Sequence, residues 1–172
     1  AVDSVIIVID HAKGVEQQTR RLMEVCRMRH TPVIVFINKL DREGLDPFDL
    51  LDEVERELGV VTTPMVWPIG MGDRFKGVYN IFDHELNLFT PNKQHVVEDI
   101  HHIESLDSPD LVQHIGSAAA ERLAEEVEMV EGVYPTFDHD AYLAGEQAPV
   151  FFGSALNTFG VRELLDLSLI HI

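Results

Sequence analysis

The stretch Val33-Ile34-Val35-Phe36-Ile37-Asn38-Lys39-Leu40-Asp41 decides the fold of this chain. Its first five residues are apolar and mostly β-branched, which is typical of a strand buried on both faces of a parallel sheet. The polar tetrapeptide 38–41 follows where that strand ends. Ligands of parallel α/β folds bind outside the carboxyl ends of the strands, so residues 38–41 are a candidate binding loop.

The tetrapeptide has the residue types that guanine recognition requires. Guanine presents two neighbouring donors, N1–H and the exocyclic amine, and the carboxylate of Asp41 can accept both in charge-assisted hydrogen bonds. Adenine lacks the donor at N1 and leaves one carboxylate lone pair unmet. Asn38 can bond the base edge and tie neighbouring loops together, while the stem of Lys39 can lie across the purine with its ammonium in water. For the tetrapeptide alone, a solvated turn is the alternative.

A second loop, Gly153-Ser154-Ala155-Leu156, also follows an apolar run, residues 149–152. The carboxyl ends of parallel strands lie at one edge of a sheet, so we expect the two loops to meet at one base. The backbone N–H of Ala155 can then donate to guanine O6, a carbonyl that adenine lacks.

The sequence before residue 33 predicts the neighbouring elements. Residues 5–9 form a continuous apolar run, expected to be a strand buried on both faces. Residues 16–29 are expected to form a helix, which makes a right-handed βαβ unit with the two strands. The side chains expected to face the sheet are Leu22, Val25, Cys26 and Met28.

The segment after Asp41 predicts a second helix with clear ends. Asp46 is the expected N-cap, Pro47 occupies the first helical position, and Gly59 fits the stop. The apolar residues recur at spacings of three, three and four, which places them on one face. They are Phe48, Leu51, Val54 and Leu58.

The middle of the chain changes character. Residues 63–69 predict one strand containing Trp67, and a hairpin is expected at 83–85 between strands 75–81 and 86–89. Further along, residues 92–110 look irregular, a helix from 110 or 117 to 130 is expected to bury Ala119, Leu123, Val127 and Val130, and 138–144 form a short helix. The expected units are a core at 1–69, an inserted α+β subdomain at 70–147, and the core's return at 148–172.

Composition limits the classes of function. The chain has 172 residues and is 45% hydrophobic. Its formal net charge of −17 argues against a direct nucleic-acid site and permits a basic protein partner. The simpler interpretation is that the charge keeps the protein soluble. Cys26 is the only cysteine, which fits a reducing, cytoplasmic compartment and a packed side chain. We expect no secretory signal and no membrane span, and we expect further sequence before residue 1 because the chain opens on a core strand.

Other reactive residues do not form sites by their spacing. The pair His101-His102, with His95 and Glu98 nearby, points in different directions and lacks a cysteine ligand, so we expect no metal site. Asp10 is expected to be a turn or capping residue rather than a catalyst. Ser154 has no partner base and no nucleophile-elbow pattern, so we expect no hydrolase triad and no catalytic residue in these 172 residues.

Several segments of the chain resemble translational GTPases of the elongation-factor-G type. These are residues 1–4, 8–10, 13–16, 18–19 and 36–43. Other segments are most similar to the class-II peptide chain release factors, the stop-codon GTPases called release factor three. These are residues 46–47, 50–55, 63–70, 75–79, 149–157 and 159–161. The similarity extends over residues 1 to about 166.

The resemblance implies the carboxyl half of a P-loop GTPase domain with an inserted subdomain. Asn38, Lys39 and Asp41 match the family's fourth motif, with Leu40 as its variable position; its fifth motif is matched by Ser154, Ala155 and Leu156. The ligand would be GTP or GDP. The implied activity is GTP hydrolysis on the ribosome, which promotes release of the stop-codon-reading factors during translation termination.

The resemblance also implies what 1–172 lacks. The phosphate-binding loop and both switches, which hold Mg²⁺, the γ-phosphate and the attacking water, precede the similar region. We therefore expect Mg²⁺ binding and hydrolysis only in the longer parent, and His11 is not the family's catalytic His. The tail at 168–172 departs from the family. An elongation-factor-G-like or ribosome-protection GTPase is the alternative, as is an interaction module that docks the ribosomal stalk protein through the acidic insertion.

Overall fold

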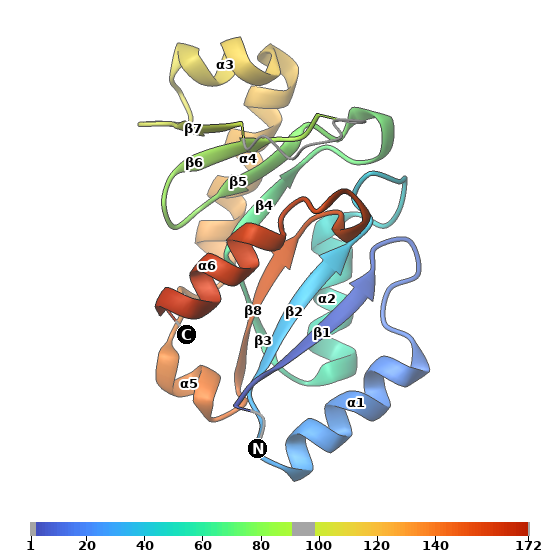
Figure 1. Ribbon diagram of the computed structural model, residues 1–172. Helices are drawn as coiled ribbons and strands as arrows, with labels where there is room; N and C mark the ends of the chain where they lie inside the picture. The colour runs from blue at the N-terminus through green and yellow to red at the C-terminus, as the bar shows by residue number, and fades with distance from the viewer. Residues whose placement is uncertain (1–2, 91–98, 172) are drawn as a thin grey trace.

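The computed structural model describes residues 3–90 and 99–171, and Figure 1 shows two sheets with flanking helices. The first sheet is parallel throughout, in the order β1-β2-β8-β3. Its strands are β1 (Val5–Asp10), β2 (Val33–Asn38), β8 (Gln147–Phe152) and β3 (Val61–Pro64). The α/β class and the parallel sheet are confirmed.

The second sheet is antiparallel, in the order β4-β5-β6-β7, and lies beyond the carboxyl ends of the parallel strands (Figure 1). Its strands are β4 (Val66–Ile69), β5 (Gly77–Asn80), β6 (Glu85–Leu88) and β7 (Ile100–His102). The expected hairpin between β5 and β6 is confirmed. We call this sheet, with α3 (Pro109–Ile115) and α4 (Ser117–Val133), the second layer.

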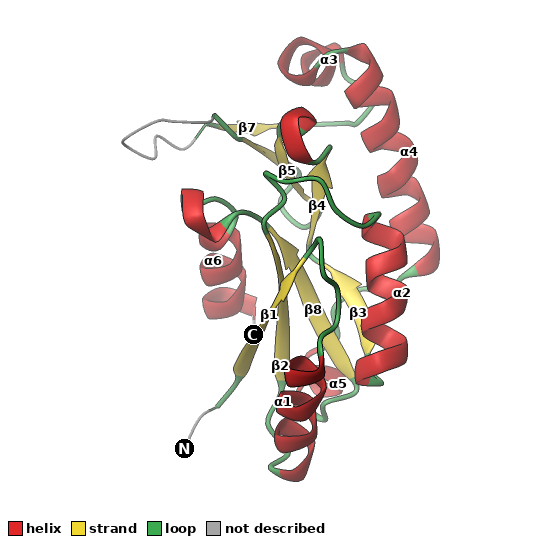
Figure 2. Ribbon diagram, turned by 90° about the vertical axis from the view of Figure 1, so that its right-hand side faces the viewer, coloured by secondary structure: helices red, strands yellow, loops and turns green. Residues whose placement is uncertain are grey.

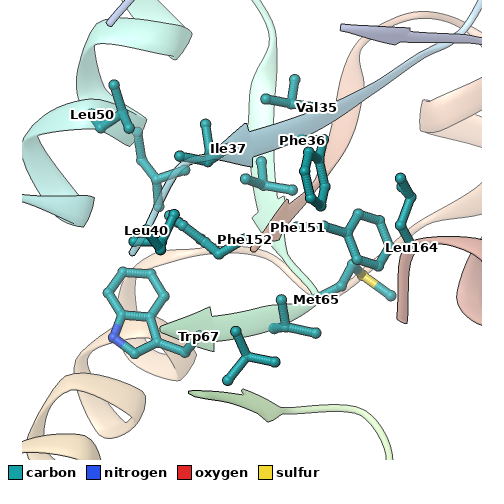
Figure 3. Packing of buried hydrophobic residues seen from close by; sticks show 14 of the residues in the cluster. Val35, Phe36, Ile37, Leu40, Leu50, Met65, Trp67, Phe151, Phe152 and Leu164 are labelled. Carbon is teal, nitrogen blue, oxygen red and sulfur yellow. The ribbon is translucent and has the colours of Figure 1, made fainter. Parts of the chain in front are cut away.

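The remaining helices lie against the parallel sheet, with α2 and α6 on opposite faces (Figure 2). They are α1 (Gln17–Met28), α2 (Pro47–Leu58), α5 (His139–Leu143) and α6 (Val161–His171), with short 3₁₀ turns at η1 (Gly72–Arg74) and η2 (Ala155–Asn157). The predicted bounds of α1, α2 and α5 hold within about a residue. The core between these elements is continuous, as Figure 3 shows around Trp67 and Phe152.

The expected burial of residues 5–9 on both faces is wrong. Ile7 and Ile9 are 1% exposed, whereas Ile6 and Val8 on the other face are 44% and 56% exposed. The cause is position, because β1 is the edge strand of its sheet and pairs only with β2 among the described strands.

The expected inner face of α1 is also partly wrong. Cys26 is buried as predicted, but Leu22, Val25 and Met28 are exposed, and Thr19 and Met23 face the core instead. Residues 19, 23 and 26 are spaced four and three apart and form one helical stripe, from which residue 28 points away. Burial raises the pKa of the Cys26 thiol, which keeps it in the protonated, packed form.

One predicted strand, 63–69, is two strands of different sheets. β3 pairs with β8, and β4 pairs with β5. Met65 lies between them: its N–H donates to Val150 O at 2.9 Å and its carbonyl accepts from Ile81 N at 3.1 Å. An unbroken apolar pattern does not reveal such a change of pairing partner, because both sheets bury this segment.

The region 92–133 contains more structure than the sequence predicted. Residues 91–98 lie outside the described part of the chain, but β7 and the start of α3 occupy stretches expected to be irregular. Gly116, with φ of 85°, separates α3 from α4, so both proposed helix starts exist. The expected apolar face of α4 is confirmed at Leu123, Val127 and Val130, with Ala120 more deeply buried than Ala119.

The start of α2 offers a stability test. Asp46 accepts a hydrogen bond from Phe48 N at 2.9 Å, with Pro47 at the first helical position. We expect Asp46→Ala to lower the free energy of unfolding by about 1 kcal/mol, because it removes the partner of a helix-terminal N–H. Urea denaturation of the two proteins measures the loss. Asp52→Ala, on the exposed face of the same helix beyond its first turn, is the control, and an equal loss there would contradict the capping role.

No helix in the described ranges 3–90 and 99–171 is both long and apolar enough to cross a membrane.

Candidate nucleotide-binding site

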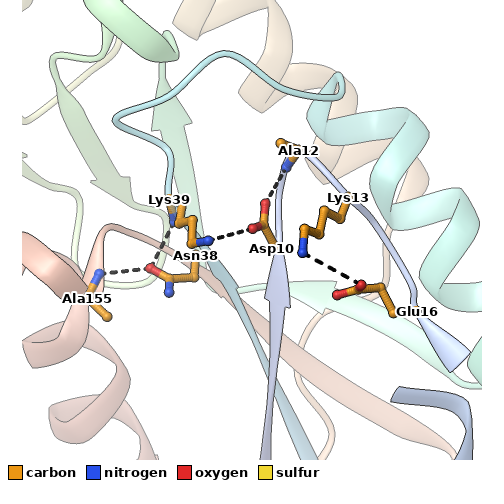
Figure 4. A network of polar contacts seen from close by, with 7 residues as sticks. All are labelled: Asp10, Ala12, Lys13, Glu16, Asn38, Lys39 and Ala155. Carbon is orange, nitrogen blue, oxygen red and sulfur yellow. Dashed lines mark hydrogen bonds and ion pairs between the residues drawn. The ribbon is translucent and has the colours of Figure 1, made fainter. Parts of the chain in front are cut away.

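The two predicted loops meet at the carboxyl edge of the parallel sheet, and Asn38 joins them (Figure 4). Its Oδ1 accepts the backbone N–H of Ala155 at 2.8 Å and that of Lys39 at 2.8 Å. Ala155 lies 117 positions away from Asn38 in the chain. With Oδ1 held by two donors, the amide nitrogen of Asn38 keeps its N–H groups for a ligand.

Backbone hydrogen bonds fix the same two loops below Asn38. Leu40 N donates to Gly153 O at 3.1 Å, and Gly153 N donates to Ile37 O at 2.9 Å. The Leu40 side chain is fully buried in the core. Leu40 therefore holds its loop on the sheet and leaves Asn38, Lys39 and Asp41 at the rim.

Lys39 adopts a left-handed backbone conformation, with φ of 73°, that residues other than glycine rarely adopt. Its ammonium, which we expected to stay in water, donates to Asp10 Oδ2 at 2.7 Å. The reason is register, because Asp10 and Asn38 are paired neighbours at the ends of β1 and β2. Asp10 also accepts from Ala12 N at 2.9 Å, which confirms its predicted place in a turn.

The Asp10–Lys39 pair makes stability depend on pH. The hydrogen bond from the Lys39 ammonium holds the pKa of the Asp10 carboxyl below its ordinary value of 3.8. A lowered folded-state pKa means that the unfolded chain binds the proton more tightly. The stabilisation is therefore present above pH 3.8 and is lost as the pH falls through the folded-state pKa.

We expect Asp10→Asn to lower the free energy of unfolding at pH 7 by about 0.2–1 kcal/mol, since the pair is partly exposed. The difference from wild type should shrink as the pH falls below 3.8 and vanish below the lowered folded-state pKa of Asp10. Urea denaturation at several pH values measures it, with Asp49→Asn as the control. A difference that stays constant with pH would show that the pair does not lower the pKa of Asp10.

Asp41 carries a carboxylate oxygen without a partner. Its Oδ1 is closed off from solvent and accepts no hydrogen bond from the described residues. The loop that follows is held by buried His11, whose Nε2–H donates to Arg42 O at 2.9 Å, while His11 O accepts from Leu45 N at 3.1 Å. Buried carboxylate oxygens normally have donors, so the Asp41 side chain has to turn Oδ1 toward the rim before that oxygen can accept N–H groups of a ligand.

The second loop places its three predicted residues in different environments. Ser154 is fully buried, and its hydroxyl accepts from Asn157 Nδ2 at 2.8 Å. Ala155 is exposed and donates its N–H to Asn38, which in this structure takes the place of the expected guanine O6. Leu156 is 82% exposed. Ala155 therefore joins this loop to Asn38, and Ser154 is buried beneath Ala155.

A hollow of about 650 Å³ lies away from these loops. It is formed by the end of β3, the turn before β6 and the segment after α4, where Phe82, Tyr134 and Phe137 contribute aromatic walls. It shares no residue with either loop. Shape alone therefore does not locate the candidate site, which is an open rim defined by hydrogen-bonding groups.

The histidine pair does not form a metal centre with described neighbours. His101 Nε2 contacts Asp99 Oδ1 at 2.7 Å and its ring stacks on His114 at 3.9 Å. His95 and Glu98 lie outside the described residues. Within the ranges 3–90 and 99–171, no three His, Cys, Asp or Glu side chains are grouped to hold a metal ion.

Comparison with known proteins identifies the family. The family model described as the elongation factor Tu GTP binding domain matches residues 1–172. The chain belongs to this family. It is therefore a translational GTPase-like domain, and its family membership implies GTP or GDP as ligand.

A solved structure agrees in fold. The crystal structure of ttk003000868 from Thermus thermophilus has a TM-score of 0.67 and 22% sequence identity to this chain. The match includes 98% of this chain and 26% of that one, so the chain spans about a quarter of that protein's length. This likeness supports the fold of the GTP binding domain.

Proposed function

We propose that this rim binds the guanine base of GTP or GDP. The observation that carries the proposal is the position of Asn38, whose Oδ1 joins both loops and whose Nδ2 remains a donor. Guanine N7 accepts such a donor. Once Asp41 Oδ1, which is closed off from solvent in this structure, turns toward the rim, the carboxylate can accept from the N1–H and the exocyclic amine of the same base. The roles of Lys39, Ser154 and Leu156 are to flank and support these contacts.

Calorimetric titration of GDP and ADP into the longest natural protein that contains this chain tests the proposal. We expect GDP to bind at least about 100-fold more tightly, because adenine leaves the Asp41 carboxylate and the Asn38 amide without matched partners. Equal affinities for the two nucleotides would overturn the proposal.

We infer that residues 1–172 comprise the carboxyl half of a P-loop GTPase domain and an inserted α+β subdomain. The sequence contains no Gly-x₄-Gly-Lys-Ser/Thr loop to hold phosphates. The division 1–69, 70–147 and 148–172 is supported by the second sheet, of which all strands except β4 lie within 70–147.

The residues present do not fit the Mg²⁺ that the family implies, because the phosphate-binding loop whose Ser or Thr holds that ion is absent from residues 1–172. Purified 1–172 should therefore show no magnesium-dependent GTP turnover, whereas the longer parent should be a GTPase. Release of inorganic phosphate from GTP measures this. Turnover by 1–172 would contradict the proposal that the groups required for GTP hydrolysis lie in the parent outside these 172 residues.

We propose further that the parent is a cytoplasmic termination factor similar to release factor three. The support is the set of release-factor-like segments around both loops, residues 46–47, 50–55, 63–70, 75–79, 149–157 and 159–161. The parent should accelerate dissociation of a stop-codon-reading factor from ribosomes whose peptide has been freed, in a GTP-dependent way. Acceleration of translocation, or displacement of tetracycline, would instead favour the elongation-factor-G-like or ribosome-protection alternative.

One observation favours an additional interaction role for the second layer. Glu121, Glu125 and Glu128 are exposed at spacings of four and three, so they form an acidic stripe on α4. Such a stripe suits a basic surface, of which the ribosomal stalk protein is the candidate partner. Glu126 is not part of the stripe, because its carboxylate accepts from Trp67 Nε1 at 2.7 Å.

Charge reversal tests this docking surface. The variant with Lys at 121, 125 and 128 should lose retention on immobilised stalk protein at low salt. A matched control reverses three exposed carboxylates elsewhere: Glu24, Asp49 and Glu104. Equal retention of the two variants would overturn the assignment to α4.

A further inference from the structure

An aromatic cluster connects the loop after β8 to the second layer. Phe159, which is 7% exposed, places its ring 5.7 Å from that of Phe75 and 5.3 Å from that of Phe89, in edge-to-face arrangements. Phe75 and Phe89 contact each other at 5.2 Å. Both flank the second layer: Phe75 precedes β5, and Phe89 directly follows β6. Edge-to-face ring pairs at these separations contribute more stabilisation than the burial of their apolar area alone.

Phe159 is connected directly to the residues of the candidate site. Ser154 N donates to Phe159 O at 2.9 Å and Phe159 N donates to Ser154 O at 2.9 Å, which closes the short loop that displays Ala155. The ends of this loop touch: a Cβ on Gly153 would lie 2.3 Å from Phe159 O. A shift of Phe159 therefore moves the Ala155 N–H relative to Asn38.

The other loop contacts the same part of the second layer. Gly72 N donates to Leu40 O at 2.9 Å, and Phe75 N donates to Gly72 O at 3.1 Å. Leu40 stands between Lys39 and Asp41 in the base-binding tetrapeptide. The segment 72–75 thus contacts both loops, one through a backbone hydrogen bond and one through the Phe75 ring.

We propose that Phe159 is a positioning residue for guanine recognition, and that the second layer sets how tightly the nucleotide is held by fixing Phe159 between Phe75 and Phe89. This inference rests on the proposed function of the rim. None of the three rings belongs to the residues that contact the base. A partner that displaces the β5–β6 hairpin would loosen both loops and speed nucleotide release.

The first test measures release of fluorescently labelled GDP from the longest natural protein that contains this chain. Phe75→Ala should speed dissociation about tenfold, because a fall of the ordered form of the loops to about a tenth of the population weakens binding about tenfold, and such losses appear mostly in the dissociation rate. Phe75→Leu, which keeps a bulky apolar side chain, should restore most of the difference. Phe75→Ala combined with Phe159→Ala should release GDP no faster than the faster single variant, because both remove one contact.

Phe137→Ala is the matched control. Phe137 is a half-buried aromatic residue that contacts Tyr142 at 5.8 Å, away from both loops. Its loss should lower the melting temperature but leave GDP release within about twofold of wild type. If Phe75→Ala and Phe137→Ala change the release rate alike, the effect is general destabilisation and the proposal is wrong.

The second test does not depend on nucleotide. In the nucleotide-free protein, Phe75→Ala should speed amide hydrogen exchange at Ser154 and Ala155 about tenfold, while exchange at Phe151 inside β8 stays unchanged. Failure of wild type to bind GDP would remove the proposed function, yet this exchange would still report on positioning. Unchanged exchange at Ser154 and Ala155 would overturn the role of the aromatic cluster.

Discussion

Asp41→Asn should weaken GDP binding by about 100-fold to 1,000-fold in the natural protein that contains this chain. The substitution replaces an acceptor that matches both guanine donors with an amide that can accept only one of them. It also places an N–H₂ group against the exocyclic amine. Charge-assisted hydrogen bonds contribute about 1.5–3 kcal/mol each, and about 1.4 kcal/mol corresponds to a factor of ten.

The same change should favour a different base. Xanthine carries a carbonyl where guanine carries the exocyclic amine, so the amide introduced by Asp41→Asn can donate to that carbonyl and accept from N1–H. We therefore expect this variant to bind xanthosine diphosphate more tightly than GDP, the reverse of wild type. Competition against a fluorescent nucleotide measures both affinities.

Asp49→Asn is the control for this specificity test, since it makes the same chemical change on the exposed face of α2. It should leave both affinities at the wild-type values. If Asp41→Asn weakens binding of GDP without strengthening binding of xanthosine diphosphate, then Asp41 supports the loop but does not contact the base.

The sequence predicted the elements that local chemistry determines. The apolar run 33–37, the Asp46 cap and the Gly59 stop each specify one local conformation, and the structure has all three. The sequence was less informative about burial, which depends on the neighbours that a strand or helix has in the fold. An edge strand and a central strand can have the same composition, so the exposure of Ile6 and Val8 depended on strand order.

The candidate site followed the same rule. The meeting of Asn38 with Ala155 was predictable, because both follow strands of one parallel sheet. The Asp10–Lys39 pair was predictable from the same pattern, because Asp10 also ends an apolar run of a neighbouring strand. The contact of Phe159 with Phe75 and Phe89 had none, since it depends on how two sheets pack across long sequence separations.

Trp67→Ala should produce the largest loss of stability, about 3–5 kcal/mol. Trp67 is fully buried where the two sheets meet, with its ring 4.7 Å from Phe48 of α2 and 5.5 Å from Phe152 of β8. Its Nε1–H donates to Glu126 Oε2 on α4 at 2.7 Å. One side chain thus contacts the parallel sheet, its covering helix and the second layer, and its removal leaves a cavity among all three.

Two further variants separate the causes of that loss in urea denaturation. Trp67→Phe keeps most of the apolar volume but removes the donor to Glu126, so it should cost about 1–3 kcal/mol. Met28→Ala, at a side chain that is 74% exposed, should change the free energy of unfolding by less than about 0.5 kcal/mol. If the two sheets unfold independently, Trp67→Ala should split the single transition in two. If they form one cooperative unit, the transition stays single and only its midpoint falls, which is the result expected from the shared core.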